Sequence, residues 1–323
     1  MAFTWAICTY NKLRSTWAGA SIYSASTENA AYPKENAIDG NIESEWRATA
    51  SPAILVIDSG VASPALQYLC LWFSYDMIPT SVKIETSAAA GSGYASIANN
   101  YDGTVATTLS AIAVRSSRIL SLTSSTNFHV GNTIRVSDGV LAAKKYLIVA
   151  VGTGYVEIDQ FPLPHANGAA AALYPDSCIL AVVGVTETKR YVKLTITAAT
   201  PHLLEAQGFG ISYSFDGNAL PLNPFPISET RSTGNIARSL SNYGIGKMHT
   251  GPNYSKYSLS IGRIGKNGNA ILSWLEKQGR FGILMDNGEY HEVMLSGDIG
   301  RLRRMSSENE LVSYSTQLMM EEV

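Results

Sequence analysis

Apolar and polar residues alternate over short stretches along most of the chain, and this pattern predicts β-strands. Within the first hundred residues, the apolar segments 54–57, 68–75 and 81–84 have the length of strands and are separated by Gly, Pro or Asp. We therefore expect a mainly β protein that begins with a β-sandwich.

The pattern changes after residue 88. Residues 88–102 are small, polar and contain glycine, which is typical of a connection between modules. Beyond them, residues 128–139 form an alternating segment with a turn, and 145–151 and 155–159 have the length of two further strands. We expect a small β-barrel or hairpin module over residues 102–174. It would either display a surface away from the sandwich or act as a spacer.

A third pattern begins near residue 208. Predicted strands at 211–215, 257–261, 281–285, 291–297 and 311–320 enclose one predicted helix at 270–278. In that helix Ile271, Trp274 and Leu275 lie at helical spacing, Asn269 can cap the first turn, and Gly279 follows the end. Residues 208–323 are therefore expected to form a second β domain with one helix.

Composition narrows the class of protein. With a net charge of −2, the 323 residues give no reason to expect nucleic acid or an anionic membrane as a partner. The three cysteines are odd in number and far apart, which favours buried thiols over disulfides or a zinc site. We expect no signal peptide and no membrane span, because the first residues lack a basic and an apolar region and no apolar run approaches ~20 residues. This predicts folding in a reducing cytoplasm.

The stretch 32–49 collects a turn, several oxygen donors and one large aromatic residue. Asp39 and Asn41 flank Gly40, which can adopt a positive φ, and Ser44 adds another oxygen. Trp46 is large enough to anchor the loop on a hydrophobic layer. Such a set of oxygens suits a hard cation such as calcium. It is equally compatible with a plain turn, which the chain repeats at 216–218.

The run Ala37-Ile38-Asp39-Gly40-Asn41, followed by Ser44 and Trp46, resembles the signature of discoidin domains, also called coagulation factor 5/8 C-type or galactose-binding-like domains. Residues 54–60 resemble the family's strand that ends in Asp-Leu-Gly, and residues 189–196 resemble its late strand. The resemblance implies a jelly-roll sandwich over 1–101 and 175–207, with 102–174 inserted. It also implies glycan or lipid-headgroup binding and a structural calcium on Asp39, Asn41, Ser44 and the Ala37 carbonyl. The family's later acidic ligand has no match.

Residues 235–241 and 314–323 resemble minor tail and distal tail proteins of long-tailed bacteriophages. In that family a sandwich with one flanking helix forms a ring on the tail tube, so the resemblance implies a tail-tube-like domain over 208–323 and a homo-oligomeric ring. The polar segment 218–256 would then be an extended arm on a neighbouring subunit, or else a surface loop.

No arrangement of catalytic residues is found. The glycine-rich stretch 262–268 lacks the spacing of a phosphate-binding loop, and the five histidines are scattered. We therefore expect no enzyme.

The main hypothesis is a virion component of a phage tail tip or baseplate, with other tail proteins as partners and the discoidin-like domain facing host-surface glycan. The alternatives are a carbohydrate-binding module that serves glycan-degrading enzymes, and a glycosidase. The aromatic residues Tyr23, Tyr32 and Tyr94 are candidates for sugar or subunit contacts.

Overall fold

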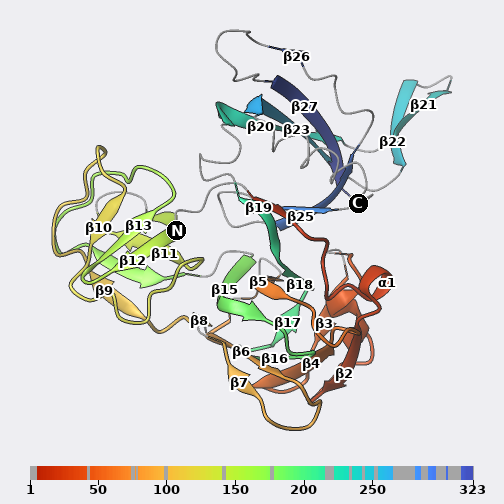
Figure 1. Cartoon of the computed structure of the whole chain (residues 1–323), viewed down its shortest axis with the longest axis horizontal. Helices are drawn as coiled ribbons and strands as arrows, with labels where there is room; N and C mark the ends of the chain where they lie inside the picture. Colours follow the sequence, from red (N-terminus) through yellow and green to blue (C-terminus); the bar gives the residue numbers. More distant parts are fainter. Residues whose placement is uncertain are drawn as a thin grey trace. The chain divides into compact units, whose positions relative to one another are not determined.

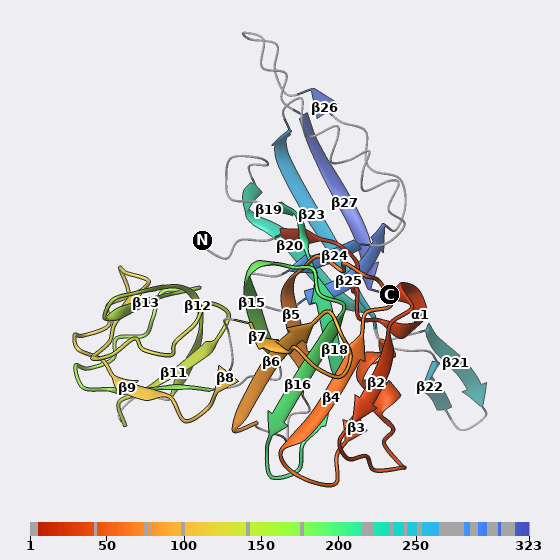
Figure 2. The same cartoon turned by 60° about the horizontal axis from the view of Figure 1, so that its bottom comes forward.

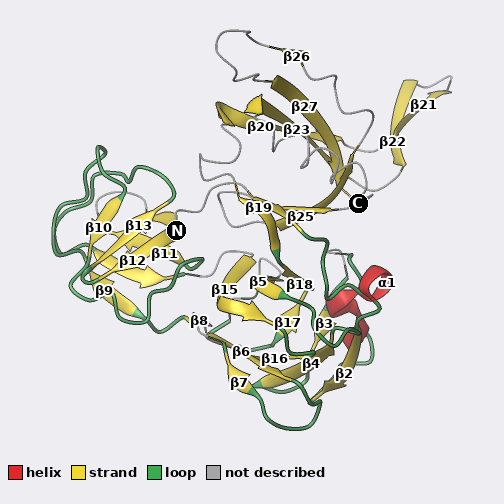
Figure 3. Ribbon diagram, viewed as in Figure 1, coloured by secondary structure: helices red, strands yellow, loops and turns green. Residues whose placement is uncertain are grey.

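The computed structural model describes residues 6–41, 44–73, 77, 79–97, 101–139, 143–174 and 178–214. Beyond these it describes only the strands of residues 222–322 that are named below. The described chain is mainly β, as predicted, and its helical segments are the short α1 (Ser15–Ala18) and η1 (Lys34–Ile38) (Figure 3). The helix predicted at 270–278 lies outside the described residues.

Two compact units make up the chain. The first holds Met1–Phe3, Asn11–Ile211 and Leu284–Tyr290, and the second holds Thr4–Tyr10, Ser212–Ile283 and His291–Val323.

The first unit contains a β-sandwich of antiparallel strands (Figure 2). One sheet has the order β2 (Ser21–Ala25), β4 (Ala53–Asp58), β16 (Tyr191–Thr197), β6 (Ser81–Ser87) and β7 (Ala95–Ser96), with β8 (Tyr101–Asp102) also paired to β6. The second sheet has the order β15 (Cys178–Glu187), β5 (Leu66–Trp72) and β18 (Glu205–Phe209). The pair β3 (Trp46–Arg47) and β17 (His202–Leu203) is separate. The predicted strands at 54–57, 68–75, 81–84 and 189–196 correspond to β4, β5, β6 and β16.

Alternation along these strands builds the sandwich core. Val192, Leu194 and Ile196 of β16 are fully buried, whereas the residues between them are partly exposed. The same period of two buries Leu55 and Ile57 of β4, because successive side chains of a strand point to opposite faces. One face of this six-stranded sheet therefore covers the core, and the other carries the remaining side chains of these strands.

Residues between β8 and β15 form a separate small barrel (Figure 1). Its six strands have the order β10 (Ile119–Ser121), β13 (Tyr155–Ile158), β12 (Lys144–Gly152), β11 (Thr133–Ser137), β14 (Ala170–Leu173) and β9 (Ala106–Thr108). The two edge strands meet at an antiparallel bridge between Leu109 and Leu122. Hydrogen bonds from Ser110 N to Ser121 O and from Thr123 N to Thr108 O, both 2.9 Å, close the sheet there. Of the two predicted forms, barrel or hairpin, the structure has the barrel.

The second unit is built on an eight-stranded sheet. Its order is β19 (Ile211–Ser214), β1 (Ala6–Cys8), β24 (Phe281–Leu284), β25 (Tyr290–Leu295), β27 (Tyr314–Glu322), β23 (Tyr254–Ile264) and β20 (Leu222–Ser232), with β26 (Arg303–Arg304) paired to β27. A hairpin of β21 (Asn235–Ser241) and β22 (Gly244–Thr250) is separate. The N-terminal strand β1 thus lies in this sheet, although residues 1–101 were predicted to belong to the sandwich.

The segment predicted to be an extended arm or a surface loop consists largely of strands. Residues 218–256 contain β20, β21 and β22, so the loop alternative is wrong, and packing of an arm on a neighbouring subunit stays a prediction. The backbone of β20 pairs with β23 of the same chain, and β21 pairs with β22. Each of these strands therefore has a partner strand within the chain, which a polar composition does not prevent.

Candidate functional site

The predicted cation loop is held together by its own hydrogen bonds. Asp39 Oδ1 accepts a hydrogen bond from the Asn41 amide at 2.8 Å, and Asp39 Oδ2 accepts one from Ser44 Oγ at 2.7 Å. Ala37 is fully buried in η1, immediately before the turn. The structure thus brings Asp39, Asn41 and Ser44 into contact, while Gly40 has a φ of +82°.

This loop is a weak match to the chemistry of calcium. Asp39 is the one carboxylate among the predicted ligands, and both of its oxygens already accept hydrogen bonds from described residues of the loop. The guanidinium of Arg14 lies against Gly40, with Nη2 3.5 Å from the Gly40 carbonyl oxygen. A guanidinium beside the turn repels a second cation. Among the described residues no group of three His, Cys, Asp or Glu side chains could hold a metal ion. Calcium binding by this loop stays a prediction.

Trp46 anchors the loop, as predicted. Its side chain is fully buried in the sandwich core, and its backbone pairs with Leu203 of β17. Asn36 Nδ2 donates to the neighbouring Glu45 carbonyl at 2.9 Å and ties η1 to the same strand. These contacts tie η1 and the residues before β3 to the sandwich core.

A different group of aromatic residues gathers on the outward face of the six-stranded sheet that contains β2, β4, β16 and β6. Tyr191 of β16 lies opposite Asp58 of β4 and Ser87 of β6. Tyr23 of β2 sits in a register shift between Ile22 and Ser24, and such bulges re-aim side chains. The rings of Tyr23 and Tyr191 make an edge contact with centroids 5.8 Å apart.

Tyr94 completes this group. Its hydroxyl donates a 2.7 Å hydrogen bond to the Ala90 carbonyl, and the Lys193 ammonium lies 4.6 Å from its ring centroid. Burial, followed by the electrostatic effect of Tyr191, Tyr23 and Glu85, raises the pKa of Tyr94. Lys193 lies two residues after Tyr191 on the same face of β16, so Tyr94 adjoins the pair of Tyr23 and Tyr191. We call the surface formed by Tyr23, Tyr94 and Tyr191 the tyrosine face.

Ion pairs border the tyrosine face. Asp58 accepts two hydrogen bonds from Arg190, at 2.7 Å from Nε and 2.8 Å from Nη2. The Arg190 guanidinium also lies 5.4 Å from the ring centroid of Tyr191. These hydrogen bonds from Arg190, helped by the Gly60 amide, hold the pKa of Asp58 below its usual value against the effect of burial. Asp58 is thus ionised and holds the Arg190 guanidinium in place.

Glu85 holds two lysines in the same way that Asp58 holds Arg190. Its carboxylate oxygens lie 2.9 Å from Lys83 Nζ and 2.6 Å from Lys193 Nζ. Burial opposes the ionisation of Glu85, but the hydrogen bonds from Lys193 and Lys83 outweigh it and lower its pKa. Lys193 is therefore positioned between a carboxylate and the ring of Tyr94.

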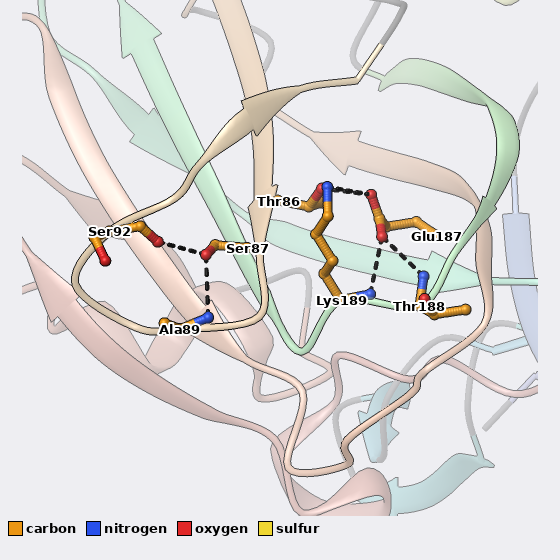
Figure 4. Close-up of polar contacts among 7 residues, drawn as sticks. All are labelled: Thr86, Ser87, Ala89, Ser92, Glu187, Thr188 and Lys189. Carbon is orange, nitrogen blue, oxygen red and sulfur yellow. Dashed lines mark hydrogen bonds and ion pairs between the residues drawn. The ribbon is translucent and has the colours of Figure 1, made fainter.

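The turn between β15 and β16 is held from the other face of β6, since Thr86 pairs with the core-facing Val192 (Figure 4). Glu187 accepts hydrogen bonds from Thr86 Oγ1 at 2.5 Å and from the amides of Thr188 and Lys189 at 2.8 and 2.9 Å. On the neighbouring turn, Ser87 Oγ donates to the Ser92 carbonyl at 2.5 Å. Burial opposes the ionisation of Glu187, but its hydrogen bonds lower its pKa. Both turns are thus held by side chains at the end of β6.

The sequence identified part of this site. Tyr23 and Tyr94 were candidates, and the structure brings them together with Tyr191, which was not singled out. The alternation of residues 191–197 could have indicated that Tyr191 faces outward. The third candidate, Tyr32, lies elsewhere, with the Arg47 guanidinium 4.2 Å from its ring centroid.

Two further predictions concern cysteines and membranes. Cys8 and Cys70 are buried free thiols, as expected, while the side chain of Cys178 lies outside the described residues. No helix in the described part of the chain has the length and apolar character to cross a membrane.

No protein-family model matches the chain, and no curated protein matches it in sequence. Some solved structures are similar. A family 89 glycoside hydrolase from Clostridium perfringens is 10% identical with a TM-score of 0.34, and the match covers 62% of the present chain and 15% of the hydrolase. A chitosan-binding module of a chitosanase/glucanase from Paenibacillus sp. is 13% identical with a TM-score of 0.32, over 62% and 99% of the two chains.

A family 32 carbohydrate-binding module of NanJ from Clostridium perfringens, solved with galactose, is 12% identical with a TM-score of 0.27, over 64% and 100% of the two chains. The present chain thus spans 14–15% of the length of the family 89 hydrolases that it matches. Likeness at this level does not establish what the present chain binds.

Proposed function

We propose that the sandwich binds glycan on the tyrosine face. The observation that carries this proposal is the grouping of three tyrosines on the outward face of one sheet, with Tyr23 56% exposed. The C–H faces of a sugar ring are apolar and pack on an aromatic ring, whose large area dominates such contacts. Sugar hydroxyls need hydrogen-bonding groups around that ring, and Arg190 and Lys193 supply charged donors there.

Tyr23 is the residue best placed to pack against a sugar. Arg190 lies over the ring of Tyr191, and Lys193 lies over the ring of Tyr94. Tyr23 meets Tyr191 through an edge contact and remains the most exposed of the large apolar side chains on β2 and β4. We therefore assign the stacking contact to Tyr23 and the polar contacts to Arg190 and Lys193.

Replacing Tyr23 by alanine is expected to weaken glycan binding about tenfold or more, because truncating an exposed aromatic anchor removes most of its contact area. The measurement is affinity electrophoresis of the whole chain through gels that contain a panel of polysaccharides. Tyr155→Ala is the matched control, since Tyr155 is an exposed tyrosine of the barrel. Equal retardation of wild type and Tyr23→Ala, or no retardation by any polysaccharide, would contradict the proposal.

We also propose a biological role for the chain as a whole. From the resemblance of residues 235–241 and 314–323, we propose a tail-tip or baseplate component of a bacteriophage that binds without turning glycan over. The test is the mass of the purified assembly, with electron microscopy of the same sample. Closed rings are expected. A monomer that is also absent from purified virions would favour the alternative, a binding module that serves glycan-degrading enzymes.

A further inference from the structure

The carboxylates around the tyrosine face are withdrawn from solvent. The side chains of Asp58 and Glu85 are only 13% and 10% exposed. Each carboxylate also accepts two hydrogen bonds from cationic groups of the protein. These two groups are therefore poorly placed to accept further hydrogen bonds from sugar hydroxyls.

The cations that these carboxylates hold are more exposed. The side chains of Lys83 and Arg190 are 50% and 41% exposed, and that of Lys193 is 22% exposed. Three cations thus accompany two carboxylates on this face. A ligand that approaches the tyrosine face meets positive N–H groups first, although the chain as a whole carries a net charge of −2.

These cations also keep hydrogen-bond donors for a ligand. A guanidinium has five N–H donors and an ammonium has three. The contacts described for Arg190 use Nε and Nη2 on Asp58, and those for Lys193 place one carboxylate oxygen of Glu85 at 2.6 Å. Because Asp58 and Glu85 fix the two cations beside Tyr191 and Tyr94, little side-chain freedom remains to be lost on binding.

We infer that the tyrosine face selects glycans that carry carboxylates, such as polyuronates, over neutral glycans. This inference rests on the proposed function. A sugar carboxylate would accept hydrogen bonds from Arg190 or Lys193 while its ring packs on Tyr23. Hydrogen bonds between a cation and a carboxylate are about twice as strong as those between neutral groups, so the acidic sugar gains most from this arrangement.

The test compares two forms of one polymer. The whole chain is titrated with polygalacturonate and with its methyl ester, which has the same backbone without the charge, at low and at high salt. We expect the acidic form to bind about tenfold or more tightly at low salt and to lose that advantage as salt screens the charges.

Substitutions of single cations distinguish recognition at the tyrosine face from general electrostatic attraction to the protein surface. Lys193→Gln and Lys83→Gln, each checked for an unchanged melting temperature, are expected to reduce the preference for the acidic form severalfold. The matched control is Arg118→Gln, which removes an exposed cation from the barrel. Equal binding of both polymers, or an equal loss in Arg118→Gln, would overturn the inference and leave glycan binding intact. Binding of neither polymer together with none in the polysaccharide panel, or binding that survives Tyr23→Ala, would overturn the proposed function as well.

Discussion

Replacing Trp46 by alanine is expected to lower the free energy of unfolding of the first unit by about 3–5 kcal/mol, the usual cost of truncating a fully buried aromatic side chain. Trp46 is 0% exposed and belongs to the same core as Ala37 and Ile38 of η1. Its loss leaves a cavity under the loop that carries Asp39. Urea unfolding followed by circular dichroism measures the change.

Trp46→Phe distinguishes packing from hydrogen bonding. Among the described residues, the buried Trp46 Nε1 has no hydrogen-bond partner, so phenylalanine sacrifices no such bond and removes only part of the ring volume. A loss of about 1–2 kcal/mol is expected for this variant. A loss as large as that of Trp46→Ala would contradict the account of Trp46 as a packing anchor.

Replacing Gly60 by alanine has the second large expected effect, a loss of about 2–4 kcal/mol. Gly60 has a φ of +76°, which an L side chain rarely adopts. A Cβ there would lie 2.5 Å from the Gly19 carbonyl oxygen, and this backbone atom cannot move aside as a flexible side chain can. The Gly60 amide also donates to Asp58 Oδ1 at 2.8 Å, so the substitution disturbs the support of Arg190.

Gly91→Ala is the control for this substitution. No atom lies within 4 Å of a Cβ at Gly91, and Gly91 does not have a positive φ. Its replacement should be neutral or slightly stabilising, because alanine restricts the unfolded chain. Thermal unfolding of both variants is the measurement, and equal melting temperatures for Gly60→Ala and Gly91→Ala would refute the proposed clash.

The sequence predicted local features of the fold well. The strands β4, β6 and β16 follow their expected segments closely, as do β11, β12 and β13 of the barrel. The burial of Trp46 and the turn at Gly40 also follow from residue types within a few positions of one another. Local alternation and turn chemistry carry this information, because each depends on neighbours along the chain.

The pairing of strands that are far apart in the chain could not be predicted from the sequence. Nothing local distinguishes Leu109 and Leu122, which close the barrel, from other leucines of that module. The strand β1 has only three residues, and its place in the sheet of the second unit depends on partners from residues 211–214 and 281–284. In so short a strand, the alternation of apolar and polar residues does not indicate which strand it pairs with.

The sequence by itself determined where strands such as β4, β6 and β16 lie, and it supplied Tyr23 and Tyr94 as candidates. Only the tertiary structure decided that β2, β16 and the turn after β6 bring Tyr23, Tyr191 and Tyr94 together beside Arg190 and Lys193. The physical reason is that a period of two specifies the face of a strand but not its neighbour. Strand order and register are chosen by the packing of the whole sheet.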